Sequence, residues 1–494
     1  MMSYKLKKHL ALFVLLAALL FFADPVSGEV LHQVDFDEEA AEVESFFVME
    51  SDEGVNRWSI GIEMDENVEI EEVSSQVGEA SYEFEDGQLD LMVKTSFPRK
   101  EHDIEVNWVL KDAKQERYPG LDELDMNLFG FEDKETGVRV THSDILSWHE
   151  PLGYRSVLSD GELRFSGEGH LWLRAYISEN GKSTENYHYF EDFDMSQAEE
   201  LVTLVEYMTG STNPQRRFPV VFLDDESYDE DFSPWSDGTY KTGGLIVLRE
   251  ALSKTDRIRT LLHETVHGFN DRALKWDRTE TAYYDEGAAQ FVELLASEVL
   301  DSPRAEIFGE DVLFEEDGSR YRLPSRSSPE ELWNYYKEGE DWIKYWSPRR
   351  EEFSEVRTFG YVLSELIVRK RVGDRGIESL QEVYSELSDI DRRIDDPEEK
   401  AEVIGVFFDL RPCYSENKTE FELCLEEINE QSFDLEYIDL NHTFEDEREE
   451  IEIGERRVLE EQDSLDGLTL LLENMFSTIK DFFGGFSVWI SRKL

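Results

Sequence analysis

Two histidines spaced for one face of a helix are the feature that most constrains this chain. The segment HETVH at residues 263–267 puts His263 and His267 four positions apart, so on an α-helix both rings can reach one metal ion. Glu264 projects beside that ion and can serve as a general base. A catalytic zinc ion takes three protein ligands and leaves one position for water. Glu286, on a following helix, is the natural third ligand.

An incidental origin of this pattern is the alternative. The five-residue motif arises by chance in about a few per cent of chains with ten histidines and abundant glutamate. In that case the histidines belong to an ordinary surface helix, and Glu286 is one acid among many. The block DEGAAQFVE at residues 285–293 follows on the second helix and strengthens the metal-site interpretation.

These residues resemble a known peptidase family. The segment 263–293 looks like the active-site segment of the gluzincin zinc metallopeptidases (the peptidase MA-like superfamily), which include thermolysin and aminopeptidase N. Eighteen residues separate His267 from Glu286, as in the aminopeptidase-N-like branch, and DEGAAQFVE is close to that branch's NEGFAxFVE. GLIVLRE at 244–250 resembles its GLITYRE strand, just ahead of the zinc helix. The resemblance covers roughly residues 195–370.

The resemblance implies one Zn²⁺ per chain, and its ligands would be His263, His267 and Glu286. Glu264 would take a proton from the zinc-activated water and pass it to the leaving amine. Glu293 lies seven residues past Glu286, on the same helix face. In the family that position holds a zinc histidine from behind and fixes its ring orientation. An ordinary solvated acid is the alternative for Glu293.

The residue that stabilises negative charge in the transition state departs from the family pattern. The branch uses a tyrosine three residues before a glycine at the start of a helix, whereas the matching stretch RTFG at 357–360 carries arginine there. A cationic side chain can also stabilise an oxyanion, so Arg357 is the first candidate and Tyr345 the second. Tyr361 and Tyr336 are further alternatives nearby.

A second departure concerns the amino terminus of the substrate. In the aminopeptidase-N branch a GAMENW motif directly precedes the GLITYRE strand, and its glutamate binds the free α-amine. An ungapped alignment backwards from Gly244 puts GTYKTG at 238–243 in that place, with Lys241 at the position of the glutamate. A lysine repels a protonated amine, so we expect a substrate with an internal bond or a capped or acidic N-terminus. The acidic segment 224–230 is a source of a replacement carboxylate.

An excess of acidic side chains limits the partners of this protein. The 494 residues carry 113 Asp and Glu against 50 Lys and Arg, a formal net charge of −63. With 40% hydrophobic and 12% aromatic residues, the chain is not a disordered acidic polymer. Molar salt screens such self-repulsion within a few ångströms, so we expect a halophilic source, with dedicated calcium binding as the weaker alternative. Nucleic acid is not expected as a partner, because no basic stripe exists to neutralise phosphates.

The N-terminus is typical of an exported protein. Three lysines within the first eight residues precede an apolar run at 10–22, which suits a signal peptide and is short for a membrane span. A small-residue cleavage site at 26–28 predicts a signal peptide over residues 1–28, and an uncleaved anchor is the alternative. In either case the mature chain is expected to be extracellular or at the cell surface. Its two cysteines, Cys413 and Cys424, then predict one local disulfide, with two buried thiols as the alternative.

The patterning predicts a multidomain chain. Short alternating strands indicate an N-terminal all-β, sandwich-like domain over 30–190. An α+β thermolysin-like catalytic domain with a helical C-terminal part is expected over 195–440. An acidic linker follows at 445–464, and an amphipathic helix at 465–491 either docks on the protein's own core or lies on a membrane surface.

Two shorter segments carry local predictions. Asp86-Gly87, between alternating runs, predicts a tight β-hairpin turn. The stretch from Asp225 to Asp237 is predicted to be an acidic loop.

The sequence therefore favours an exported zinc metallopeptidase acting on a peptide or protein substrate. The alternative is a non-catalytic, zinc-binding surface or scaffold protein that retains the peptidase fold. The complete motif, with Glu264 present, argues against that alternative, because a decayed site usually loses its base or a ligand. The sequence leaves the oligomeric state open.

Overall fold

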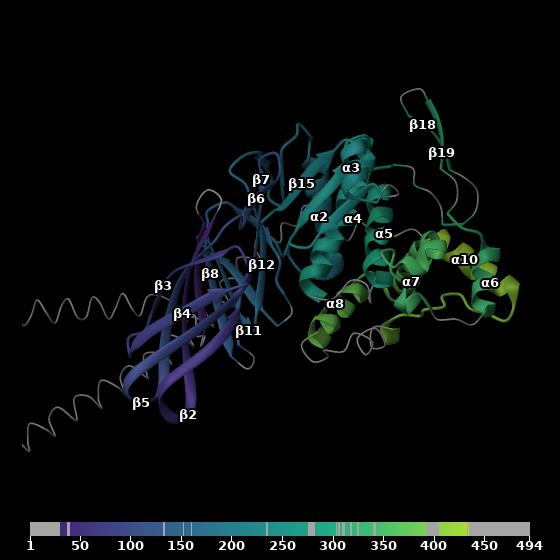
Figure 1. Cartoon of the computed structure of the whole chain (residues 1–494). Coiled ribbons are helices and arrows are strands. Elements are labelled where there is room, and N and C mark those ends of the chain that lie inside the picture. The colour runs from purple at the N-terminus through teal and green to yellow at the C-terminus, as the bar shows by residue number, and fades with distance from the viewer. Residues whose placement is uncertain are drawn as a thin grey trace, which may run out of the picture. The chain divides into compact units, whose positions relative to one another are not determined.

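A computed structural model of the chain describes residues 30–433, with short gaps (Figure 1). The gaps fall at residues 37–39, 132–133, 152, 160, 234–235, 275–281, 303, 305–306, 309–311, 317–318, 324–325, 339–341, 392–404 and 432. The chain runs from a β-rich region through a mixed α/β region to a helical part, all within the compact unit Met1–Ile438. The predicted signal peptide at 1–28, acidic linker at 445–464 and amphipathic helix at 465–491 lie outside the described residues.

Two sheets make up the β-rich region, drawn in purple and blue in Figure 1. The larger sheet has eight strands in the order β10-β11-β8-β1-β2-β5-β3, with β4 also paired to β5, and the smaller has four in the order β6-β7-β12-β9. The strands are β1 Val30–Phe36, β2 Ala41–Glu63, β3 Val68–Ser74, β4 Glu79–Glu85, β5 Gln88–Leu110, β6 Lys114–Tyr118, β7 Leu121–Leu128, β8 Glu135–Thr141, β9 Ile145–Trp148, β10 Arg155–Ser159, β11 Glu162–Glu168 and β12 Leu171–Ile177.

One apolar core is shared by the two sheets. In β12, Leu171 and Leu173 are fully buried while Trp172 between them is exposed, because successive side chains of a strand point to opposite faces. The same core includes residues of the larger sheet such as Val106 and Trp108 on β5. The two sheets therefore pack face to face as two layers.

The predicted hairpin is confirmed. β4 and β5 are antiparallel, and Glu85 pairs with Gln88 across a two-residue turn. Asp86 and Gly87 have φ values of 50° and 75°. Positive φ angles at both central residues are typical of a type I′ turn, whose twist matches that of the flanking strands. Aspartate and glycine tolerate positive φ angles.

A five-stranded sheet supports the site, in the order β13-β14-β15-β17-β16. Its strands are β13 Lys182–Ser183, β14 Tyr187–Tyr189, β15 Phe218–Leu223, β16 Gly238–Lys241 and β17 Leu245–Arg249. β15 and β17 run parallel and are buried along nearly their whole length, whereas β16 is antiparallel to β17 and forms one edge. The helices α2 Ser196–Thr209 and α4 Lys254–Leu274 contact each other, and α4 also contacts β16 and β17.

The predicted acidic loop over 225–237 is wrong in its first half. Residues Asp225–Asp231 form a short helix, α3. The Asp224 side chain accepts hydrogen bonds from the backbone N–H groups of Glu226 and Ser227, which satisfies donors that the first turn leaves free. Local capping by Asp224 therefore outweighs the like-charge repulsion between the acids that follow.

Helices dominate the remainder: α5 Ala282–Val299, α6 Pro329–Glu338, α7 Arg357–Arg375, α8 Glu378–Asp391 and α10 Lys418–Asn429, with 3₁₀ turns η1 Trp342–Tyr345 and η2 Glu351–Val356. A hairpin, β18 Val312–Glu316 and β19 Ser319–Leu323, was not predicted. Cys413 and Cys424 form a disulfide that ties α10 to the segment before it. Among the described helices, none combines the length and apolarity that a membrane crossing needs.

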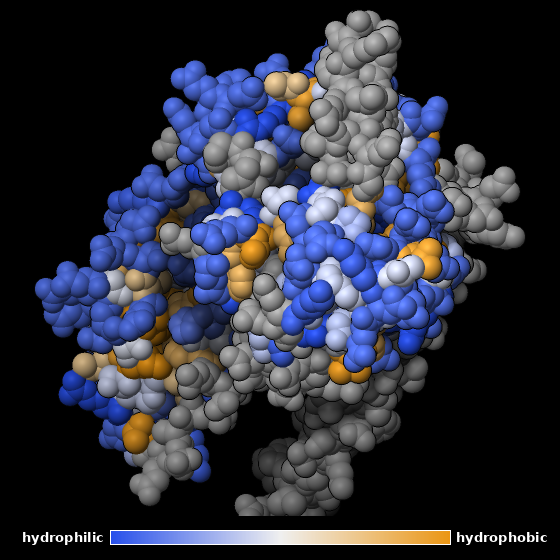
Figure 2. Space-filling view, turned by 90° about the vertical axis from the view of Figure 1, so that its right-hand side faces the viewer, coloured by the Kyte–Doolittle hydropathy of each residue, from blue (hydrophilic) through white to orange (hydrophobic). Residues whose placement is uncertain are grey.

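Polar side chains cover most of the surface in view in Figure 2, and apolar residues appear there in small patches.

Buried polar side chains in the β-rich region are linked by a series of hydrogen bonds. His32 is fully buried, and its Nε2 lies 2.7 Å from the Phe129 carbonyl oxygen. Since a carbonyl only accepts, Nε2 carries the proton and Nδ1 accepts the Ser45 hydroxyl at 2.8 Å. The Ser45 oxygen in turn accepts a bond from the Trp108 indole at 2.9 Å. Every member is satisfied only while His32 is neutral, and burial lowers the pKa of His32 from 6.5 to about 4.

We predict that His32 makes folding pH-dependent. Below pH 6.5 the unfolded chain binds a proton on His32 that the folded chain takes up only near pH 4. The free energy of unfolding should therefore fall by about 3 kcal/mol across this window on account of this residue. Urea unfolding of the wild type and His32→Gln at pH 7 and pH 4.5 measures it, with the exposed His170→Gln as control. An unchanged pH dependence in His32→Gln would refute the assignment.

Candidate active site

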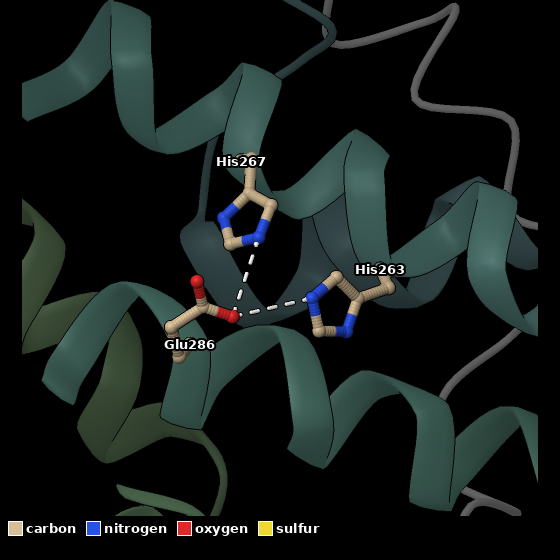
Figure 3. A group of neighbouring side chains, drawn as sticks. All are labelled: His263, His267 and Glu286. Carbon is tan, nitrogen blue, oxygen red and sulfur yellow. Dashed lines mark ion pairs between the residues drawn. The ribbon is translucent and has the colours of Figure 1, made fainter. Parts of the chain in front are cut away.

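Helices α4 and α5 bring the predicted metal ligands together. On α4 the buried Ile258, Leu261 and Val266 form the apolar side, so the histidines project from another face. Nε2 of His263 lies 3.4 Å from Oε2 of Glu286, and Nε2 of His267 lies 3.6 Å from the same oxygen (Figure 3).

The three side chains point to one location. Their ligand atoms all lie within 4.8 Å of one another, and each of the three is buried or nearly so. Two imidazole nitrogens and one carboxylate oxygen are the donor set of a catalytic zinc site that keeps a position open.

A carboxylate lies behind each histidine ring. Glu293 Oε1 is 2.7 Å from Nδ1 of His263, the position in which the family resemblance put it. Asp285 Oδ1 is 2.8 Å from Nδ1 of His267. A carboxylate at Nδ1 keeps the proton on that nitrogen, which leaves the lone pair of Nε2 directed at the shared location. With both Nε2 lone pairs and a carboxylate oxygen directed at one location, these residues have the chemistry of a divalent-cation site.

Asp285 was not predicted as a site residue. It lies directly before Glu286 on α5, and it also accepts a hydrogen bond at 2.5 Å from the side-chain amide of Asn270. The sequence held one signal for it: in the DEG block, aspartate takes the place of the asparagine in the family's NEG. Nothing in the spacing alone shows that its side chain turns to His267.

The charges of this centre are strongly coupled. Burial disfavours the charged form of His267, but Asp285 and Glu286 outweigh it and raise the pKa of the ring to about 9. Burial also opposes ionisation of Glu286, yet His267 and His263 hold the pKa of that carboxyl well below its usual range. Acidic groups thus surround the two rings, and a metal ion bound there would supply the positive charge that this arrangement favours.

A cavity of about 1330 Å³ opens over the centre. Glu264 lines it and is only 6% exposed. A Cβ atom at Gly238 would lie 3.1 Å from Cγ of Glu264 and 2.5 Å from Cγ2 of Thr260, so glycine lets β16 approach α4 beside the predicted base. The edge strand β16 therefore forms one wall of the cleft.

Of the four residues expected to stabilise the oxyanion, two line the cleft. Arg357 and Tyr361 both line the cleft, and Nε of Arg357 donates to the Pro348 carbonyl at 3.0 Å. Burial and the charges of Glu286 and Glu264 raise the pKa of Tyr361 well above its usual value, which keeps the phenol protonated as a donor.

Two predicted alternatives lie elsewhere. Tyr345 was expected in the site, but it is not one of the residues that line the cleft. It lies on η1 and is 36% exposed, and Nζ of Lys344 lies over its ring. Tyr336 is buried and donates to the Pro412 carbonyl at 2.9 Å. Spacing along the chain cannot tell which face of a helix or turn meets the cleft, and Tyr361 takes the place expected for Tyr345.

Lys241 lies at the end of β16 and lines the same cleft. Its Nζ is 4.7 Å from the ring centroid of Phe232, and no carboxylate of the described residues lies within ion-pair distance of it. Burial, followed by the charge of Arg117, lowers the pKa of Lys241. The cleft thus presents a half-buried cation that lacks a direct acidic partner in the described part of the chain.

A glycine sets the distance between α5 and α7. A Cβ atom at Gly287 would lie 2.4 Å from the Ser364 carbonyl oxygen, closer than atoms approach. Glycine therefore lets the two helices pack backbone to backbone directly beside Glu286. Glu286 is held in place by this contact as well as by the histidines.

Comparisons with known proteins give distant structural likeness only. No family model matches the chain, and no curated protein matches it. The fold is similar to an M1 zinc metallopeptidase from Deinococcus radiodurans, with 10% identity, a TM-score of 0.35, and coverage of 80% of this chain and 92% of that chain. A mutant of that enzyme bound to Tyr-Ser-Ala gives 12% identity, a TM-score of 0.34, and 77% and 93% coverage.

A third similar structure is the aminopeptidase A of Legionella pneumophila in complex with aspartic acid. The identity is 13% and the TM-score 0.35, and the match covers 77% of this chain and 47% of that chain. At these TM-scores the likeness carries no weight for function, which rests on the site's own residues.

We predict that the purified protein binds about one zinc ion per chain and that His263→Ala removes it, because the site then keeps only one imidazole and one carboxylate. Metal analysis after dialysis measures both. The exposed His170→Ala, which changes a histidine far from the centre along the chain, should retain the metal. An intact protein without metal, or a His263→Ala protein that keeps it, would contradict the assignment.

Proposed function

We propose that this protein is an exported zinc metallopeptidase that hydrolyses peptide bonds. The observation that carries the proposal is the convergence of His263, His267 and Glu286 on one location, with Glu264 in the cleft beside them. Export is supported by the N-terminal sequence and by the disulfide, since disulfides persist mainly in oxidising compartments.

Each residue of the site has a distinct part in the reaction. When bound, a zinc ion lowers the pKa of water to about 7 and polarises the scissile carbonyl. Glu264 accepts the proton of the attacking water and delivers it to the leaving amine. Tyr361 and Arg357, which both line the cleft, donate to the carbonyl oxygen as it gains negative charge. Burial and the nearby carboxylates raise the pKa of Tyr361 and so keep its phenol protonated as a donor.

The test of this mechanism is Glu264→Gln. Glutamine keeps the shape of the side chain and removes the base, so zinc content should stay unchanged while kcat falls about 10²- to 10⁴-fold. Casein or a peptide library, assayed in molar salt with and without chelator, provides the substrate. Turnover retained in Glu264→Gln would remove this residue from the base role. An unaltered protein that binds zinc and cleaves nothing would favour the scaffold alternative.

Lys241 supports a narrower proposal about the substrate. A half-buried cation on the wall of the cleft repels a protonated α-amine and attracts a carboxylate. We propose that the enzyme prefers internal bonds, or substrates whose N-terminus is capped or acidic, and is not a standard aminopeptidase.

Free and N-acetylated versions of one peptide measure this preference. The acetylated peptide should have the higher kcat/KM, and Lys241→Glu should reverse the order because a carboxylate binds the free amine. Lys94→Glu, which makes the same change on the exposed side of β5, is the control. A clear preference of the unaltered protein for the free amine would overturn the proposal and leave the zinc site intact.

A further inference from the structure

A fully buried carboxylate on α7 gathers three arginines close to the metal centre. Glu365 is 0% exposed. Arg304 binds it through both ends of its guanidinium, with Nη1 to Oε1 and Nη2 to Oε2 each at 2.8 Å. Arg326 contacts the same carboxylate, and Nη1 of Arg369 lies 3.5 Å from it. One buried negative charge is thus surrounded by three positive ones.

Arg304 connects this cluster to the metal centre. Nε of Arg304 lies 4.0 Å from Oε2 of Glu293, and the other oxygen of Glu293 lies 2.7 Å from Nδ1 of His263. Glu293 is therefore placed between a guanidinium and an imidazole. Arg369 points elsewhere, because its Nη2 donates to the backbone carbonyls of Ile428 and Asn429.

Arg304 itself is held in a fixed position. Besides its two bonds to Glu365, its Nη2 donates to both the backbone and the side-chain oxygen of Gln290, at 3.1 and 3.2 Å. Gln290 lies three residues before Glu293 on α5, and Arg326 also donates to its side-chain oxygen, at 2.6 Å. A guanidinium is planar and carries its donors in a rigid fork, so these contacts leave Arg304 little freedom.

We propose that Arg304 is a positioning residue for the metal centre. Held by Glu365 and Gln290, it keeps the carboxylate of Glu293 turned toward His263 and so fixes the ring that presents Nε2 to the ion. Partners of this kind typically change metal affinity by about 10- to 100-fold when they are removed. The inference rests on the proposed zinc site, and it makes Arg304 and Glu365 on α7 determinants of metal affinity.

Arg304→Gln and Arg369→Gln form a matched pair for the test. Both remove an arginine from the same buried carboxylate, but only Arg304 reaches Glu293. Both variants should melt at a lower temperature. Only Arg304→Gln should weaken Zn²⁺ binding, about 10- to 100-fold in chelator competition, and shift the visible absorption bands of the Co²⁺-substituted protein. The full-length protein in molar salt is used throughout.

The outcomes separate the proposals. Equal zinc affinities and equal cobalt spectra for the two variants would overturn the role of Arg304. So would a raised KM with unchanged zinc affinity, since Arg304 also lines the cleft and would then be a substrate-binding residue. If Arg304→Gln does not fold, Arg304→Lys gives the same comparison, with a smaller but measurable loss of zinc affinity, because lysine keeps the charge and lacks the rigid fork of donors. Absence of zinc from the unaltered protein would instead refute the proposed function.

Discussion

Four carboxylates gathered around two imidazoles are the constraint on which the rest of this structure depends. Glu264, Asp285, Glu286 and Glu293 all lie on α4 or α5, with side chains at most 23% exposed. Negative charges this close, in a site shielded from water, repel one another and need positive charge beside them. The guanidinium of Arg304 supplies part of that charge, and a divalent cation bound by the two neutral histidine rings would supply the rest. The architecture around the cleft can be understood as the means of holding these groups together.

Packing at two places sets the geometry of this centre. Helix α4 contacts both the five-stranded sheet and α5, and its two histidines turn toward Glu286 on α5. On the other side, Gly287 lets α5 approach α7 so closely that a single added carbon would collide with the Ser364 carbonyl. Glu365 lies one residue after Ser364 on α7 and binds Arg304. One helix contact therefore places the metal ligand Glu286 and also the buried carboxylate that orders the guanidinium.

Several features that sequence reasoning located correctly have short-range causes. Asp86-Gly87 makes a hairpin because two neighbouring residues tolerate positive φ. Cys413 and Cys424 bond across eleven residues. The errors have a common origin in contacts that spacing cannot reveal. Capping by Asp224 turned an expected loop into α3, and only the packing of α7 shows that Tyr361, rather than Tyr345, faces the cleft.

By itself, the sequence determined which residues can hold a metal ion, because histidines four apart on a helix must share a face and a glutamate on the next helix can meet them. It also determined the acidic surface and the order of the β-rich, mixed and helical regions. The tertiary structure alone decided that Asp285 lies behind His267 and that Arg304 lies behind Glu293. Arg304 and Glu365 are separated by 61 residues, and no local pattern relates them. Burial makes their pairing obligatory, since a carboxylate removed from water needs a partner, and only the folded chain determines which one lies within reach.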